Sequence, residues 1–141
     1  MKEDQIIIHT DGGSRGNPGP AACAFVAEVN GKQLFKGSKY LGQQTNNHAE
    51  YQGVILALEW LSNKPFNYST IQLITFFLDS ELVVKQLNGL YKVKDENLRN
   101  FFFEVLSLRK KVNSEIIFKH IPREKNKIAD LLVNEELDKN Y

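Results

Sequence analysis

The segment "QIIIHTDGGSRGNPG", residues 5–19, joins a buried-looking strand to a lone carboxylate and a glycine-rich turn. Its apolar run predicts a strand over residues 4–11 that ends at Asp11. Glycine then takes four of the eight positions from 12 to 19, more than an ordinary turn requires. Such a segment favours the close approach of something bulky and anionic to the backbone. Asp11 would repel that anion, so the segment also predicts a cation between them.

The composition is that of an ordinary soluble globular protein. The 141 residues are 42% hydrophobic and 25% charged, which predicts a single domain over residues 1–141. One cysteine, Cys23, excludes an internal disulfide and a cysteine metal cage, and favours a reducing, cytoplasmic location. No stretch has the length of a membrane span, and the N-terminus does not resemble a signal peptide, so we expect no membrane partner.

The net charge of +1 argues against a strongly basic surface that binds nucleic acid throughout. A local basic patch remains an alternative to a solvated surface, and the solvated surface is favoured on composition alone. The residues concerned are Arg109, Lys110, Lys111, Lys119, Arg123, Lys125 and Lys127.

The patterning along the chain predicts an α/β protein with one mixed sheet. Strands are expected at 4–11, 20–29, 32–42, 70–78 and 115–121, and helices within 45–64, at 80–88, at 95–112 and from about residue 126. Asn30-Gly31 predicts a tight hairpin, which requires antiparallel pairing, whereas the helical crossovers require parallel strands. We therefore expect a five-stranded mixed sheet (α+β in character) with helices on both faces.

Four carboxylates lie where a site is expected. Asp11 and Asp79 each follow an apolar strand, and ligands collect beyond the carboxyl ends of strands in α/β sheets. Glu50 and Asp130 lie early in two helices on stripes that face the core, where an unpaired carboxylate is costly. Each also has a structural interpretation: Asn47 and Glu50 as a capping pair, Asp79 as an aid to the next helix, Asp11 as a turn residue and Asp130 as a solvated acid.

Four acids that converge on one end of a sheet cannot all stay ionised without cations. Ligation by oxygen alone, without cysteine or a histidine cluster, points to Mg²⁺ with Mn²⁺ as a substitute. Because Mg²⁺ completes its coordination with water and phosphate, these acids favour phosphoryl chemistry.

Four segments in chain order resemble the successive motifs of type 1 ribonuclease H. They are "TDGGSRGNPGP", "TNNHAEYQGVILAL", "FFLDSELVVKQLNG" and "HIPREKNKIADLLVNEELD", and the match runs from about residue 5 to 138. The resemblance implies a ribonuclease H-like fold and endonucleolytic cleavage of the RNA strand of RNA–DNA hybrids, leaving 3′-hydroxyl and 5′-phosphate ends. It implies two metal ions, bridged by Asp11, with Glu50 and Asp79 holding mainly one and Asp130 the other.

The same resemblance implies substrate contacts. It places the hybrid's backbone against Gly12 and Gly13, and it assigns hybrid contacts to Asn17, Thr45, Asn46 and Asn47. An asparagine amide both donates and accepts, so it can sense a 2′-hydroxyl, and turn or cap roles can coexist with this one.

The chain departs from the family pattern at two places. Residues 89–96 are too short for the basic handle that grips the hybrid in many bacterial relatives, and we expect no N-terminal hybrid-binding domain. His120 stands ten residues before Asp130, as the family's mobile histidine does, but it alternates with Ile116 and Phe118 in a strand. We therefore expect His120 to pack beside these two residues and to stabilise the fold, with a catalytic role as the alternative. Arg123, just past the strand, is the alternative phosphate contact.

The sequence favours a free-standing, monomeric hybrid nuclease without an obligatory protein partner over three other functions. A hybrid-binding module without activity does not need four mutually repelling acids. A transposase or junction resolvase of the same superfold would carry a different order of acids, without GNPG and TNN. A detached reverse-transcriptase domain is disfavoured because the sequence begins and ends cleanly around the predicted fold.

Overall fold

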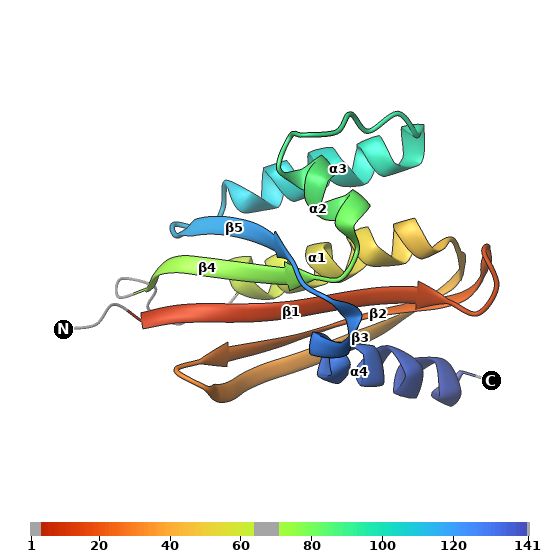
Figure 1. Cartoon of the computed structure of the whole chain (residues 1–141), viewed down its shortest axis with the longest axis horizontal. Coiled ribbons are helices and arrows are strands. Elements are labelled where there is room, and N and C mark those ends of the chain that lie inside the picture. The colour runs from red at the N-terminus through yellow and green to blue at the C-terminus, as the bar shows by residue number, and fades with distance from the viewer. Residues whose placement is uncertain (1–3, 64–70, 141) are drawn as a thin grey trace.

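The computed structural model describes residues 4–63 and 71–140 (Figure 1). Lys64 and Thr70, at the ends of two predicted elements, lie outside these ranges. The observed elements are β1 (Asp4–Ser14), β2 (Gly19–Val29), β3 (Lys32–Gln44), α1 (Asn46–Asn63), β4 (Ile71–Leu78), α2 (Glu81–Leu87), α3 (Glu96–Arg109), β5 (Glu115–His120), the 3₁₀ helix η2 (Arg123–Lys125) and α4 (Lys127–Lys139).

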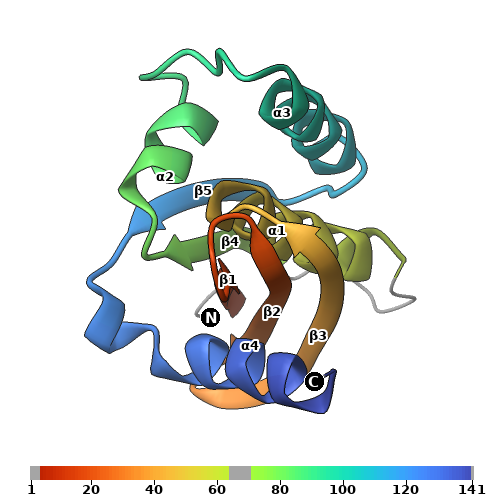
Figure 2. The same ribbon diagram turned by 90° about the vertical axis from the view of Figure 1, so that its right-hand side faces the viewer.

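The five strands form one sheet, and the helices lie on its two sides (Figure 2). Its strand order is β3-β2-β1-β4-β5, with β1 antiparallel to β2, β2 antiparallel to β3, and β4 parallel to both β1 and β5. Helices α1, α2 and α3 lie on one side of the sheet and α4 lies on the other (Figure 2). The predicted fold class is therefore confirmed.

The β2–β3 hairpin turns at Asn30 and Gly31, as the sequence predicts. Their φ angles are 52° and 80°, so both residues are in the left-handed region that a type I′ turn requires. Asparagine and glycine are the residues that tolerate this conformation best. The hairpin register that follows places the small residues of β2 beneath α4.

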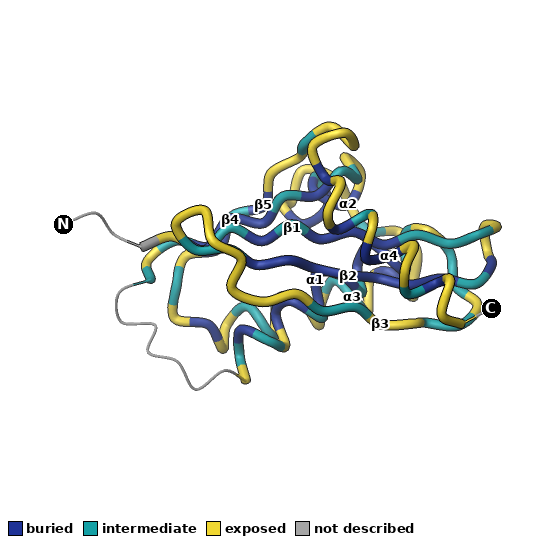
Figure 3. Tube along the Cα trace, turned by 90° about the horizontal axis from the view of Figure 1, so that it is seen from below, coloured by how far each residue is buried: buried dark blue, intermediate teal, exposed yellow. Residues whose placement is uncertain are grey.

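The main core lies between the sheet and α1. Apolar residues of β1 and β4 meet the stripe of α1, and buried residues follow these central strands while β3 is largely exposed (Figure 3). A smaller cluster fills the space between β2 and α4 and contains Ala22, Ala24, Leu132, Val133 and Leu137. Within residues 4–63 and 71–140, no helix is both long enough and apolar enough to cross a membrane.

Strand β1 is longer than the sequence predicts, and this creates a crevice. Its pairing with β4 ends at His9 and Phe77, but its pairing with β2 continues to Ser14 and Ala21. Asp11 therefore lies inside a strand rather than at its end, because β2 still supplies hydrogen bonds after β4 has turned away. The neighbouring strands separate at their carboxyl ends, which is where α/β sheets place ligands.

Candidate active site

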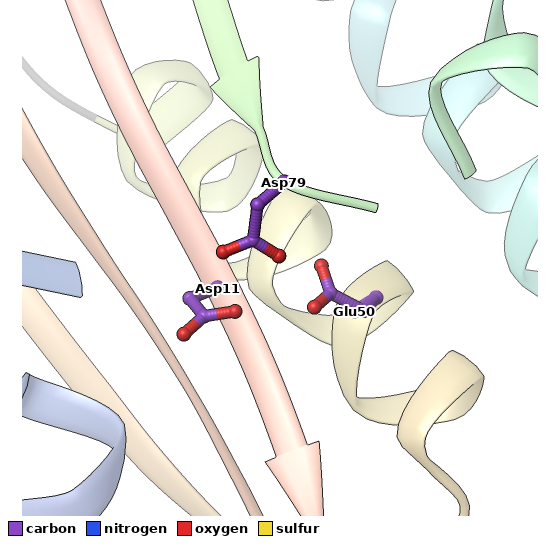
Figure 4. A group of neighbouring side chains, drawn as sticks. All are labelled: Asp11, Glu50 and Asp79. Atoms are coloured by element: carbon purple, nitrogen blue, oxygen red, sulfur yellow. The ribbon is translucent and has the colours of Figure 1, made fainter. Parts of the chain in front are cut away.

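Three of the four predicted acids meet in this crevice. Asp11 comes from β1, Glu50 from the second turn of α1, and Asp79 directly follows β4 (Figure 4). One carboxylate oxygen from each residue lies within 4.8 Å of the others. Asp11 and Glu50 are buried and Asp79 is half-buried, so the group is reachable from solvent on the Asp79 side.

Asp130 lies apart from these three but lines the same cavity, which has a volume of about 410 Å³. It belongs to the first turn of α4, and its side chain is 36% exposed. Its negative charge is close enough to contribute to the raised pKa of Asp11. The arrangement is therefore a compact group of three carboxylates with a fourth that lines the same cavity.

Two glycines allow α1 to bring Glu50 against Asp11. A Cβ atom on Gly12 would lie 2.1 Å from the backbone carbon and oxygen of Ala49, and one on Gly53 would lie 2.7 Å from the Asp11 carbonyl oxygen. Helix α1 thus packs directly on the backbone of β1. The sequence predicts that a ligand approaches Gly12, but α1 occupies that space. At Gly13 an added Cβ would have no atom within 4 Å, so ligand approach there stays a prediction.

Burial and mutual repulsion hold protons on the acidic group. Burial, followed by the charge of Asp79, raises the pKa of Asp11 to about 7, and burial with the charge of Asp11 raises the pKa of Glu50 well above its ordinary range. Without a cation, both carboxyl groups therefore keep their protons to a higher pH than ordinary carboxyl groups do.

The donor set fits a hard divalent cation. Glu50 Oε2 is buried and has no hydrogen-bond partner among the described residues, which is costly for a carboxylate. All the converging ligand atoms are oxygens, the type that Mg²⁺ and Mn²⁺ prefer. A cation would satisfy Glu50 Oε2 and offset the repulsion between the acids.

Comparisons with known proteins agree with this geometry. Residues 9–136 match the protein-family model described as reverse transcriptase-like. The fold superposes on LC11-RNase H1, solved in complex with an RNA/DNA hybrid, with a TM-score of 0.88 and 43% identity over 96% of this chain and 98% of that chain. The chain belongs to the type 1 ribonuclease H family.

Two curated proteins are also similar to this chain. Ribonuclease HI of Halobacterium salinarum is 39% identical over 95% of this chain and 65% of that protein. The bifunctional protein Rv2228c of Mycobacterium tuberculosis is 34% identical over 95% of this chain and 36% of that protein. The chain thus spans only part of the length of these curated relatives.

Two asparagines that the ribonuclease H resemblance assigns to substrate contacts, Asn17 and Asn46, join the glycine-rich turn to the start of α1. Asn46 Oδ1 accepts from Ser14 N at 2.9 Å, and Asn17 Oδ1 accepts from Asn46 N at 3.0 Å. Both carbonyl oxygens are therefore used internally, while both side chains are exposed. The amide NH₂ groups of Asn17 and Asn46 donate no hydrogen bond within the described residues, and contact of either group with a ligand stays a prediction.

The start of α1 differs from the predicted capping pair of Asn47 and Glu50. The helix begins at Asn46, and Thr45 caps it because Thr45 Oγ1 accepts from His48 N at 3.2 Å. Asn47 is half-buried in the first turn. Glu50 is therefore released from capping, and its carboxyl group turns to Asp11.

His120 and Arg123 lie in different surroundings. His120 is exposed at the end of the edge strand β5, near Glu81, so the expectation that it packs beside Ile116 and Phe118 is wrong. His120 is the last residue of an edge strand, and it stays exposed although Ile116 and Phe118 in the same strand are buried. Arg123 lines the active-site cavity, and its Nη2 lies 4.0 Å from Asp130 Oδ1 with the side chain 83% exposed.

The sequence patterns do not identify one residue of the site, Asn126. Asn126 is 1% exposed, and its Nδ2 donates to Thr10 O at 2.8 Å and to Asp79 Oδ2 at 3.1 Å. In the sequence it looks like a helix cap, but its side chain makes no capping hydrogen bond. Nothing in the local pattern distinguishes these two uses of an asparagine before a helix.

Proposed function

We propose that this protein is an endoribonuclease that hydrolyses the RNA strand of RNA–DNA hybrids with the help of divalent metal ions. The observation that carries the proposal is the buried group of Asp11, Glu50 and Asp79 at the crevice between β1 and β4. The similarity to a ribonuclease H1 that was solved with an RNA/DNA hybrid supports the choice of substrate. Hydrolysis breaks the bond between phosphorus and the 3′-oxygen and leaves 3′-hydroxyl and 5′-phosphate ends.

The acids would hold two Mg²⁺ ions, with Mn²⁺ as a substitute. Asp11 would contact both, Glu50 and Asp79 mainly one, and Asp130 the other. When bound, the ions supply an activated water and stabilise charge on the leaving oxygen. The chain's own contribution is to keep four oxygen donors in a partly enclosed cavity, where burial strengthens their attraction for cations.

Recognition of RNA would rest on the rim formed by Asn17 and the start of α1. A 2′-hydroxyl oxygen accepts hydrogen bonds, and the NH₂ groups of Asn17 and Asn46 are suited to donate to it. Thr45 and Asn47 flank these amides and would contact the hybrid beside them. Gly13 leaves space for the backbone of the nucleic acid.

We also propose that residues 1–141 form one ribonuclease H domain that works as a monomer in the cytoplasm, without an obligatory protein partner. The shared sheet and the main core that joins it to the helices support the first point. The single cysteine, whose thiol pKa burial raises to about 12, suits a reducing compartment.

The proposal is tested with end-labelled substrates of one sequence. We expect cleavage of the RNA strand in an RNA–DNA hybrid with Mg²⁺ or Mn²⁺, and no cleavage of duplex RNA, duplex DNA or single strands. Excess EDTA should stop the reaction, and the products should carry 5′-phosphates. Equal cleavage of duplex DNA, or cleavage that continues in EDTA, would refute the proposal.

Substitutions of Arg123 and His120 by alanine should affect KM differently. Arg123→Ala should raise KM for hybrid about tenfold with little change in melting temperature, because an exposed guanidinium at the cavity suits a phosphate and a charged hydrogen bond contributes roughly 1.5–3 kcal/mol. His120→Ala should leave both stability and KM nearly unchanged, because His120 is exposed. Steady-state kinetics and melting curves measure both effects.

The same pair of variants tests the catalytic alternative for the histidine. General acid–base assistance is typically worth ~10²–10⁴-fold in rate. A loss of turnover of that size in a normally stable His120→Ala protein would assign the histidine to catalysis. An unchanged KM in Arg123→Ala would remove the arginine from substrate binding.

A further inference from the structure

We infer that Asn126 is a positioning residue that fixes the Asp79 carboxylate at the metal-binding crevice. The side chain is 1% exposed and reaches across from the residue before α4. Its Nδ2 lies 2.8 Å from Thr10 O and 3.1 Å from Asp79 Oδ2. One amide group thus connects the backbone next to Asp11 with a second predicted metal ligand.

The location of this bridge follows from the sheet. The last residue pair between β1 and β4 is His9 with Phe77, so Thr10 and Asp79 come after the strands have separated. No ladder hydrogen bond fixes the distance between the strands from this point on. The two hydrogen bonds of Asn126 take the place of the missing ladder where the acids converge.

The orientation of the amide is determined by its neighbours. An NH₂ group has two hydrogens, and here each faces an acceptor: a backbone carbonyl and a carboxylate. Exchanging Nδ2 and Oδ1 would place an oxygen against two acceptors. Oδ1 itself is buried without a partner among the described residues, a cost that the two donated bonds offset.

The backbone of Asn126 extends the link to the fourth acid. Its carbonyl oxygen accepts from Asp130 N at 3.1 Å, and its N–H donates to Arg123 O at 2.9 Å. Asn126 therefore touches the Asp79 side chain, the residue before Asp11 and the turn of α4 that carries Asp130. A change of the side chain should alter the placement of Asp79 relative to the backbone beside Asp11, whereas the backbone bond to Asp130 N would remain.

The inference rests on the proposed function, since positioning is useful only if these acids hold metal ions. A carboxylate held by a donor loses less conformational entropy when it binds a cation, and partners of this kind typically affect metal affinity by about 10–100-fold. We expect Asn126→Ala to weaken Mn²⁺ binding by that factor. Asn126→Ser, which retains one donor in a smaller side chain, should fall between Ala and the wild type.

The test measures Mn²⁺ affinity by titration calorimetry without substrate, melting temperature in EDTA, and hybrid cleavage as a function of Mn²⁺. Asn140→Ala is the matched control, because Asn140 also donates through Nδ2 but at the far end of α4, to Glu136 O at 2.8 Å. The control should bind Mn²⁺ as the wild type does. Cleavage by Asn126→Ala should recover in part at high Mn²⁺.

The outcomes separate positioning from a purely structural role. If both Asn126 variants melt lower but their folded forms bind Mn²⁺ within twofold of the wild type, the inference is overturned. If Asn126→Ala does not fold, the Ser variant decides by the same criterion. Wild-type protein that binds Mn²⁺ but leaves hybrid intact would instead contradict the proposed function and leave the Asn126 measurements interpretable.

Discussion

Replacing Asp79 by Asn should abolish hybrid cleavage and make the metal-free protein more stable. The substitution keeps the shape of the side chain, and an amide oxygen at position 79 can still accept the hydrogen bond from Asn126 Nδ2. It removes one of three converging carboxylates and with it the charge of a predicted metal ligand. Metal assistance is worth several kcal/mol, and each 1.4 kcal/mol is a factor of ten, so turnover should fall about a thousandfold or more.

The gain in stability follows from charge. The negative charge of Asp79 raises the pKa of both Asp11 and Glu50, so the metal-free fold contains repulsion that the unfolded chain does not. Removing it should stabilise the metal-free protein by about 1 kcal/mol, or roughly 3 °C in melting temperature. Residues kept for function commonly carry such a cost in stability.

The effect should depend on pH. Asp11 has a folded pKa of about 7, above its unfolded value, so the folded state binds more protons between about pH 4 and 7 and loses stability as pH rises through that window. The Asp79→Asn variant lacks one cause of this shift. Its advantage in EDTA should therefore be larger at pH 8 than at pH 5.

The measurement pairs melting curves in EDTA at pH 5 and pH 8 with cleavage rates in Mg²⁺. Glu104→Gln is the control, because it removes one negative charge from an exposed position on α3. It should change neither the rate nor the melting temperature. An Asp79→Asn variant that melts several degrees below the wild type in EDTA would show that Asp79 is structural.

The fold could be predicted because its signals are local. The Asn30-Gly31 turn, the apolar stripe of α1 and the apolar run of β4 each identify an element from a few neighbouring residues. The continuation of β1 to Ser14 could not be predicted, because its hydrogen bonds come from β2 and not from its own glycine-rich sequence. Local propensity says little where a partner strand supplies the pairing.

The candidate site likewise contains residues that local sequence identifies and residues that only distant contacts define. Asp11 and Asp79 can be identified from the sequence because each follows an apolar run, and Glu50 because it interrupts an apolar stripe. Asn126 cannot be identified in this way, because its role depends on contacts with Thr10 and Asp79, which lie 116 and 47 positions earlier in the chain. The exposure of His120 depends likewise on β5 being an edge strand, which the residues around it do not reveal.

Gly12→Ala should unfold the site, whereas the neighbouring Gly13→Ala should not. A Cβ at position 12 would lie 2.1 Å from the backbone of Ala49 and 2.5 Å from Glu50 N, and backbone atoms cannot rotate away as a side chain can. Helix α1 must therefore shift on β1. Forcing extra volume into a packed site typically costs about 1–3 kcal/mol, and the clash with main chain places Gly12→Ala at or above the upper end.

This shift should also remove activity from any protein that stays folded. Glu50 follows Ala49 directly, so moving α1 moves a predicted metal ligand away from Asp11. A misplacement of about 1 Å can cost ~10²-fold in rate. We expect a melting temperature lower by roughly 10 °C and turnover lower by at least that factor, measured by melting curves and kinetics per folded molecule.

Gly13→Ala makes the comparison informative because the two glycines are adjacent in one strand. An added Cβ at position 13 meets no atom within 4 Å, and the φ angle of Gly13 is not among the positive values that disfavour alanine. Stability should therefore change by no more than about 0.5 kcal/mol. If the backbone of the hybrid approaches β1 at this open position, the methyl group should raise KM while turnover at saturation is retained. Equal destabilisation by both substitutions would mean that the glycines serve strand conformation, and an unchanged KM in Gly13→Ala would move the path of the hybrid away from β1.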